Sequence, residues 1–322
     1  MIDDKFSTRP KRKKTLNILP KNPDSTSRGR FPMWLHRPLP KGENLFQTSE
    51  ILRKYNLNTV CEEAKCPNRN LCYSNKTATF LVLGKQCTRA CGFCDIDFSK
   101  TPLPPEENEP IRIALSVKEL GLKHVVLTMV SRDDLEDGGA SHLRQIVEAI
   151  RKINTHITIE LLTSDFAGNN KAIELVLNTN PEIFNHNIES VRRLTPKVRH
   201  KATYDRTLSV LQKAKNSNQA SFIKSGLMLG FGETEEEVKE TIADLKNVGC
   251  DIITMGQYLQ ASRLKLPVVE FISPKQFKEY ENYGYSIGIK YMHCGPFVRS
   301  SFNAKQVMEL FLKDGNSPSR RN

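Results

Sequence analysis

The sequence predicts an α/β protein whose core is a partial (β/α)6 barrel. Two observations predict this fold. From about Thr77 onward, short runs rich in apolar and β-branched residues alternate with longer segments of helical periodicity. The alternation recurs six times, which implies parallel strands joined by right-handed helical crossovers. Alternation does not determine the order of the strands, so an open doubly wound sheet is the alternative fold.

The six units can be assigned to residues in chain order. The expected strands are Ala78–Leu83, His124–Val130, Ile157–Thr163, Glu182–Asn187, Phe222–Leu229 and Asp251–Tyr258. The expected helices lie near residues 113–121, 140–153, 170–178, 203–216, 234–247 and 274–283. In either fold the loops that follow the strands meet at one end of the sheet, and we expect the functional site there.

The segments on both sides of the barrel differ from it in composition. Residues 1–30 are rich in Lys, Arg, Pro, Ser and Asn without periodicity, so we expect a disordered basic tail. Residues 31–76 form an N-terminal extension, with a short helix expected near residues 47–57. The barrel is assigned to residues 77–290, and residues 291–322 form a C-terminal extension.

Hydropathy indicates the class of protein. Hydrophobic residues make up 38% of the chain and charged residues 26%, as in a globular protein. No apolar run reaches the length of about 18 residues that spans a bilayer, so we expect no membrane partner. The N-terminus is polar through Lys14, unlike a secretory signal, which predicts a cytoplasmic and reducing location.

The formal net charge of +12 is concentrated near the N-terminus. Residues 1–42 hold eleven Lys or Arg against three Asp, a charge of +8. The basic run at residues 9–14 is either a solvated arm or a segment that attracts an acidic protein or a nucleic acid. Aromatic residues are not interleaved with the basic ones, so we expect no nucleic-acid partner.

Six of the eight cysteines fall within 34 residues, in two groups with the spacings C-x4-C-x5-C and C-x3-C-x2-C. The first group is Cys61, Cys66 and Cys72, and the second is Cys87, Cys91 and Cys94. A disulfide framework does not suit a chain without an export signal, and structural zinc commonly takes four ligands. Iron–sulfur cubanes fit better, because three thiolates leave a fourth iron open to bind a small molecule.

The second cysteine group carries the strongest resemblance to known proteins. The run Cys87-Thr-Arg-Ala-Cys91-Gly-Phe-Cys94, including the aromatic Phe93, resembles the signature of the radical S-adenosylmethionine superfamily. The resemblance implies a barrel of the radical-SAM type and a 4Fe-4S cluster on these cysteines. It also implies that the open iron chelates S-adenosylmethionine, whose cleavage gives a 5′-deoxyadenosyl radical.

The first cysteine group narrows the resemblance to lipoyl synthases. The stretch CEEAKCPNRNLC at residues 61–72 closely resembles the auxiliary-cluster motif of that family. Further blocks match along nearly the whole chain from Trp34, at residues 131–140, 184–189, 224–233, 256–259 and 299–302. The resemblance implies that a second 4Fe-4S cluster is consumed as the sulfur donor. Two sulfur atoms would enter at C6 and C8 of a protein-bound octanoyl group.

The same resemblance implies the partners. The octanoyl group would be attached to a lysine of a lipoyl-carrier domain, as in glycine-cleavage H protein or 2-oxoacid dehydrogenase E2 subunits. Repeated turnover would need an electron donor and a cluster-repair protein. The enzyme itself is expected to be a monomer.

Several polar or glycine residues near the ends of the expected strands are candidates for holding S-adenosylmethionine. Related enzymes grip the methionine amino group near Ser131 and Asp133, although helix capping is an alternative role. Gly230 and Gly232 follow a strand, where backbone N–H groups can face a nucleoside. Four further residues can hold the ribose, the carboxylate or each other, and a buried ion pair is the alternative role: Glu160, Asn187, Glu189 and Arg199.

The fourth ligand of the auxiliary cluster has two local candidates. Thiolate chemistry favours Cys294, because sulfur is the usual partner of these irons. The family resemblance favours Ser301, the second serine of the Arg-Ser-Ser-Phe motif. Its harder oxygen can leave the iron when the cluster is dismantled, so we expect Ser301.

Two other functions can be compared with the lipoyl synthase function that the resemblance implies. A sulfur-inserting enzyme resembling biotin synthase is disfavoured by the first cysteine group and by the Arg-Ser-Ser motif. An electron carrier or cluster-delivery protein would not need six barrel units. Three positions depart from the lipoyl synthase pattern, in which Pro, His and Tyr are usual at Ala261, Lys265 and Phe302. These departures concern substrate contacts rather than the cluster positions.

Overall fold

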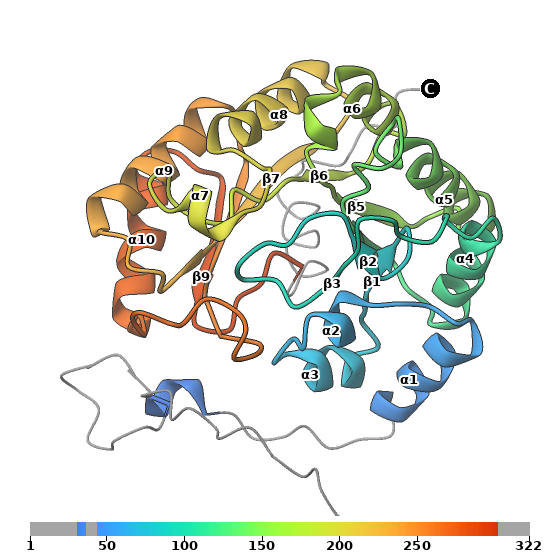
Figure 1. Ribbon diagram of the computed structural model, residues 1–322, viewed down its shortest axis with the longest axis horizontal. Coiled ribbons are helices and arrows are strands. Elements are labelled where there is room, and N and C mark those ends of the chain that lie inside the picture. Colours follow the sequence, from blue (N-terminus) through green and yellow to red (C-terminus); the bar gives the residue numbers. More distant parts are fainter. Residues whose placement is uncertain (1–30, 37–43, 302–322) are drawn as a thin grey trace, which may run out of the picture.

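The computed structural model describes residues 31–36 and 44–301, and its centre is a sheet of seven parallel strands (Figure 1). The strands are β1 (Thr79–Val82), β4 (His124–Met129), β5 (Thr158–Leu162), β6 (Ile183–Asn185), β7 (Phe222–Leu229), β8 (Ile252–Gln257) and β9 (Tyr291–Gly295). Each strand pairs with the next one in this order. A doubly wound sheet would reverse its order at a switch point, so the consecutive order confirms the partial barrel.

Helices cover the outer face of the curved sheet (Figure 1). They are α4 (Glu109–Glu119), α5 (Ala140–Ile153), α6 (Asn170–Leu177), α8 (Tyr204–Ser217), α9 (Glu235–Asn247) and α10 (Pro274–Ser286). Local capping sets several of their starts. The Thr234 hydroxyl accepts the backbone N–H of Glu237, whose carboxylate accepts the N–H of Thr234, and this capping box begins α9. None of the described helices is long and apolar enough to cross a membrane.

The shorter elements belong to the N-terminal extension and to the loops. Before β1 lie η1 (Met33–Leu35), α1 (Asn44–Lys54), α2 (Val60–Glu63) and α3 (Arg69–Ser74). The loops contain β2 (Gln86–Cys87), β3 (Asp97–Phe98), η2 (Phe166–Gly168) and α7 (Thr195–Val198). The short strands β2 and β3 pair in parallel apart from the main sheet. The expected tail at residues 1–30 lies outside the described residues.

All six expected strands and helices are present, and the sheet has a seventh strand that the alternation did not predict. Strand β9 pairs with β8 from Tyr291 to Gly295, within the segment assigned to the C-terminal extension. Its sequence, YMHCG, mixes polar and small residues, and no described helix follows it. Such a strand lacks both the apolar run and the following helix that marked the other six.

A buried ion pair lies between β5 and β7, where the Lys224 ammonium is 2.9 and 3.0 Å from the two carboxylate oxygens of Glu160. Both side chains are 0% exposed. The Asn185 amide also donates to Glu160, at 2.8 Å. Burial alone would raise the pKa of Glu160, but Lys224 and His124 outweigh it and lower the pKa from 4.5 to about 2. The structure thus places Glu160 in the buried ion pair that was its alternative role.

Lys224→Met should destabilise the fold, because it leaves the Glu160 carboxylate buried without its cation. We expect a loss of about 3–5 kcal/mol in the free energy of unfolding near pH 7, measured by urea titration. The ion pair stabilises the wild type at pH values above the ordinary pKa of a glutamate. This contribution is lost as the pH falls toward 2. The difference between the proteins should therefore shrink below pH 5.

Two further variants test whether the lost charge is the cause. Glu160→Gln combined with Lys224→Met should recover much of the stability, because neither side chain then carries an unpaired charge. Lys275→Met removes a lysine from an exposed pair with Glu279 and should resemble the wild type. A Lys224→Met protein as stable as the wild type would contradict the assigned role.

Candidate active site

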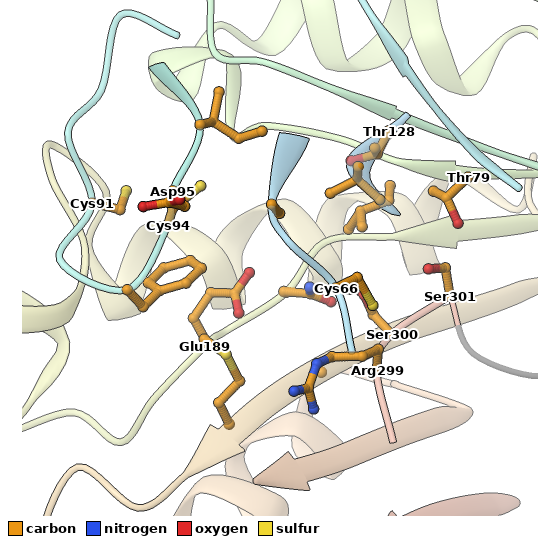
Figure 2. Close-up of a pocket in the computed structure, with 18 of the residues that line it drawn as sticks. Cys66, Thr79, Cys91, Cys94, Asp95, Thr128, Glu189, Arg299, Ser300 and Ser301 are labelled. Carbon is orange, nitrogen blue, oxygen red and sulfur yellow. Dashed lines mark hydrogen bonds between the residues drawn. The ribbon is translucent and has the colours of Figure 1, made fainter. Parts of the chain in front are cut away.

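All six clustered cysteines line one cavity of 470 Å³ at the carboxyl ends of the strands. The first group lies on and between two short helices, with Cys61 in α2 and Cys72 in α3. The second group begins with Cys87 at the end of β2 and continues through the loop that leads to β3. Figure 2 shows Cys66 on one side of the cavity and the Cys91–Asp95 loop on the other.

The thiols suit two separate clusters of iron. All eight cysteines are free. Burial, with a smaller contribution from the neighbouring Cys66 and Cys72, raises the pKa of Cys61 to about 12. Burial likewise raises the pKa of Cys94 to about 12, reinforced by Cys91 and Cys87. The three thiols of each group are therefore near enough to interact.

A cubane is a better match to these groups than a single ion. Among the described residues, no three His, Cys, Asp or Glu side chains converge as ligands of one ion. A cubane instead spreads its thiolates over separate irons. The raised pKa values of Cys61 and Cys94 favour the thiol until iron is bound, because a nearby cation makes a buried thiolate favourable. The residues present thus fit a cluster at each group.

The loop of the second cysteine group is anchored by a buried arginine. The Arg89 guanidinium contacts the Asp133 carboxylate at 2.7 to 3.2 Å and the Asp165 carboxylate at 2.7 Å. Asp165 also contacts Arg206, at 3.2 Å. Burial opposes the charge of Asp165, but Arg89 outweighs it and lowers the pKa to about 2. Two carboxylates near the ends of β4 and β5 therefore hold the loop.

Backbone contacts hold the other side of this loop. The Gly92 N–H donates to the Val198 carbonyl, and the Gly92 carbonyl accepts from Leu266, both at 2.9 Å. A Cβ at Gly92 would lie 2.8 Å from Leu266 and 3.1 Å from the Lys197 carbonyl. A side chain at this position would displace Leu266 and crowd the Lys197 carbonyl, so glycine suits the position best. The cysteine loop is thus held between the segment that ends α7 and the loop after β8.

A salt bridge joins the two cysteine groups across the cavity. Lys65, beside Cys66, contacts Asp95, beside Cys94, at 2.5 Å. The Ser262 hydroxyl donates to the same carboxylate at 2.8 Å. The hydrogen bonds to Lys65 and Ser262 lower the pKa of Asp95 despite the opposing effect of burial. Asp95 therefore connects both cysteine groups and the loop after β8.

Part of the cavity wall is polar and open to a ligand. Three buried oxygens that line it have no hydrogen-bond partner within the described part of the chain: Thr163 Oγ1, Asn187 Oδ1 and Thr254 Oγ1. Buried polar atoms without a partner are costly, so a ligand with hydroxyl or amino groups fits here. Glu189 lies between the Cys91–Asp95 loop and Arg299 (Figure 2). These groups suit S-adenosylmethionine, a nucleoside with a charged amino-acid part.

Arg199 and Glu189, which are both partly buried, complete this wall. Burial lowers the pKa of Arg199, although nearby Glu189 and Asp165 oppose the shift. Burial raises the pKa of Glu189, with Arg199 and Asn187 opposing it. The backbone of Glu189 has a φ of 66°, in the left-handed region that non-glycine residues rarely adopt. Such strain at a cavity wall is typical of functional residues.

The remaining predicted residues divide between the cavity and its surroundings. The cavity lining includes Phe93, Ser131, Asn187, Arg199 and Ser301. Four predicted residues are not among those that line it: Asp133, Glu160, Gly230 and Gly232. Asp133 binds Arg89 instead. The N–H of Gly230 donates to the carboxylate of Glu233, three residues away. Cys294 also lies outside the lining, so the two candidate fourth ligands differ in their access to the cavity.

Sequence reasoning did not identify several residues that build the site. Arg89 was part of the cysteine signature, but its partners Asp133 and Asp165 follow other strands. Thr163 and Thr254 lie on or beside β5 and β8 without any motif. Only the expectation that the carboxyl ends of the strands meet could have indicated them.

Arg89→Met should loosen the cysteine loop, because Asp133 and Asp165 lose their shared cation. A displacement of about 1 Å can cost about 100-fold in rate, and we expect a loss of that order in S-adenosylmethionine cleavage. Anaerobic formation of 5′-deoxyadenosine measures it. Arg192→Met, which removes a half-exposed arginine paired with Asp205, is the control and should retain the activity. Equal rates in both variants would contradict the anchoring role.

Comparisons with known proteins agree with this geometry. SuiB of Streptococcus suis bound to S-adenosylmethionine has a TM-score of 0.53 and 11% identity, covering 78% of this chain and 54% of SuiB. HydG, a maturase of the FeFe hydrogenase, has a TM-score of 0.50 and 15% identity, covering 73% of this chain and 62% of HydG. This chain thus spans about half the length of SuiB. At these identities the likeness concerns the fold alone.

Two family models match the sequence. The Radical SAM superfamily matches residues 81–245, and the N-terminal domain of lipoyl synthase of the Radical SAM family matches residues 3–66. The first match contains the second cysteine group. The second match contains Cys61 and Cys66 of the first group.

Curated relatives extend the match over most of the chain. Lipoyl synthase of Protochlamydia amoebophila (strain UWE25) is 62% identical over 300 residues, covering 91% of this chain and 93% of the relative. Lipoyl synthase of Chlamydia trachomatis serovar L2 is 51% identical over 297 residues, covering 92% and 95%. With the cysteine-lined cavity, these matches establish that the chain belongs to the lipoyl synthase family of radical SAM enzymes.

Proposed function

We propose that this enzyme inserts sulfur at C6 and C8 of an octanoyl chain on a carrier protein, and draws the sulfur from a cluster on Cys61, Cys66 and Cys72. One observation carries the proposal: both cysteine groups line the same cavity. The cluster of the second group would supply the electron that cleaves S-adenosylmethionine, and the cluster of the first group the sulfur. A substrate carbon placed between them would be within reach of both.

The chain itself would hold the alkyl substrate and exclude water. Part of the cavity wall is apolar and includes Leu81, Met129, Leu162, Leu227 and Met228. An unactivated C–H bond has no proton that a side-chain base can remove, which is why the family needs radical chemistry. Apolar walls suit both the octanoyl chain and a reactive radical, because they keep water from the reacting carbon.

Ser301 is proposed as the fourth ligand of the first cluster. It lines the cavity together with Cys61, Cys66 and Cys72, whereas Cys294 does not. An oxygen ligand is matched less well to iron than sulfur is, which suits a cluster that must give up its sulfur.

The proposed partners follow from the reaction. The carrier would be an octanoylated lipoyl domain of glycine-cleavage H protein or of a 2-oxoacid dehydrogenase E2 subunit. An electron donor and a protein that rebuilds the first cluster would serve repeated turnover. We infer that the enzyme acts as a monomer in the cytoplasm, where eight free thiols suit a reducing compartment. The basic tail, outside the described residues, would attract an acidic carrier domain.

Cysteine variants of the two groups test whether the second group serves S-adenosylmethionine cleavage and the first group sulfur donation. The reconstituted wild type should contain about eight irons, and a Cys61→Ala, Cys66→Ala, Cys72→Ala protein about four. That protein should cleave S-adenosylmethionine but form no lipoyl product on an octanoylated carrier. The matching variant of Cys87, Cys91 and Cys94 should lose both activities. Lipoyl formation by the first variant would refute the proposed sulfur source, and a wild type without cleavage would indicate a cluster carrier.

Ser301→Ala and Cys294→Ala distinguish the two candidate ligands. Ser301→Ala should lose lipoyl formation while retaining S-adenosylmethionine cleavage, because only the first cluster loses a ligand. Cys294→Ala should remain near the wild type in both, since its thiol lies outside the cavity lining. Product analysis by mass spectrometry of the carrier and iron analysis of each protein make the comparison. The reverse pattern would assign the ligand to Cys294.

A further inference from the structure

Asn68 connects the first cysteine group to residues 297–301, the serine segment, which lies near the other end of the chain. It lies between Cys66 and Cys72, and its side-chain amide donates to the Phe297 carbonyl at 2.7 Å. The two residues are 229 positions apart. Asn68 is only 1% exposed, so the donor of the bond is shielded from water. The contact therefore fixes the position of the serine segment relative to the cysteines.

Two more contacts hold the same segment, residues 297–301, over the sheet. The Asn187 amide donates to the Ser300 hydroxyl at 3.2 Å. At Gly256 in β8, an added Cβ would lie only 1.9 Å from the Val298 carbonyl oxygen, so the segment rests directly on the backbone of that strand. Both of these contacts come from the barrel. Asn68 adds a contact from the cysteine group itself.

The position of Asn68 argues against a purely local role. Asn68 is the N-cap residue of α3, where an asparagine side chain ordinarily accepts a backbone N–H of its own helix. Its side chain makes no such capping bond. The first turn of α3 lacks this stabilisation while the amide is directed to Phe297. A side chain that leaves its own helix uncapped serves the long-range contact instead.

We propose that Asn68 is a positioning residue that holds the Ser301 hydroxyl beside the thiols of Cys61, Cys66 and Cys72. It acts through the Phe297 carbonyl, four residues before Ser301. The proposal rests on the proposed function, in which Ser301 is the fourth ligand of the first cluster. Residues that orient a ligand without touching the metal commonly affect metal retention strongly.

Two substitutions remove the contact and keep a residue type that suits the N-cap position. Asn68→Asp has nearly the same shape and is a good N-cap, but it has no N–H to donate to a carbonyl. Asn68→Ser is also a good N-cap and adds no charge, but its side chain is too short to reach Phe297. Asn70→Asp adds the same charge on the same turn at a partly exposed position and is the matched control.

The reconstituted holoenzyme variants are compared by anaerobic iron release to a chelator and by Mössbauer spectroscopy. Both Asn68 variants should release the irons of the first cluster about 10- to 100-fold faster than the wild type. The spectrum should lose the distinct iron with an oxygen ligand. Asn70→Asp should resemble the wild type. Cleavage of S-adenosylmethionine, which depends on the other cluster, should be unchanged in all three.

A double variant shows whether Asn68 acts through Ser301. In a Ser301→Ala background, Asn68→Asp should cause no further acceleration of iron release, because the ligand that it positions is already gone. Multiplicative acceleration would overturn the proposal, as would wild-type release by both Asn68 variants. Fast release from Ser301→Ala with slow release from Asn68→Asp would overturn only the role of Asn68. Slow release from Ser301→Ala would refute its assignment as ligand, and with it this inference.

Discussion

The parallel direction of all seven strands is the constraint on which the site depends. Because all seven strands run parallel, the loops that follow them leave the sheet on the same side. The two cysteine groups come from segments before and after β1, and Ser301 comes from the segment after β9. These segments meet only because the sheet curves and its first and last strands flank one opening (Figure 1).

Buried charge organises the interior of the barrel in two layers. Deeper in the sheet, Lys224 neutralises Glu160, and the pair serves the fold rather than the ligand. Nearer the cavity, Arg89 is held by Asp133 and Asp165, and this cluster of ions fixes the loop that carries three cysteines. Each carboxylate keeps its charge because a cation offsets the cost of burial. The site is therefore stiff where the iron must be placed.

The helices, the strands and the role of the six cysteines could be predicted from the sequence better than the contacts between distant segments. Strands and helices follow from local periodicity, and the cysteine spacing lies within short segments. Asp133 and Glu160 were assigned to ligand binding, and the structure gives them an arginine and a lysine partner from other parts of the chain. Strand β9 was missed because its pattern is irregular. Asn68 was not identified from the sequence, because its partner Phe297 lies near the far end of the chain.

The bond from Asn68 to Phe297 has a consequence for biosynthesis. Residues that contact each other across 229 positions cannot meet until the ribosome has made both. At about 5–20 residues per second, the cysteines of the first group wait roughly 10 to 45 s for the segment that closes their side of the cavity. The loop of the second group obtains Asp133 and Asp165 much sooner. The two halves of the cavity thus mature at different times during translation, and the half that carries Asn68 is completed last.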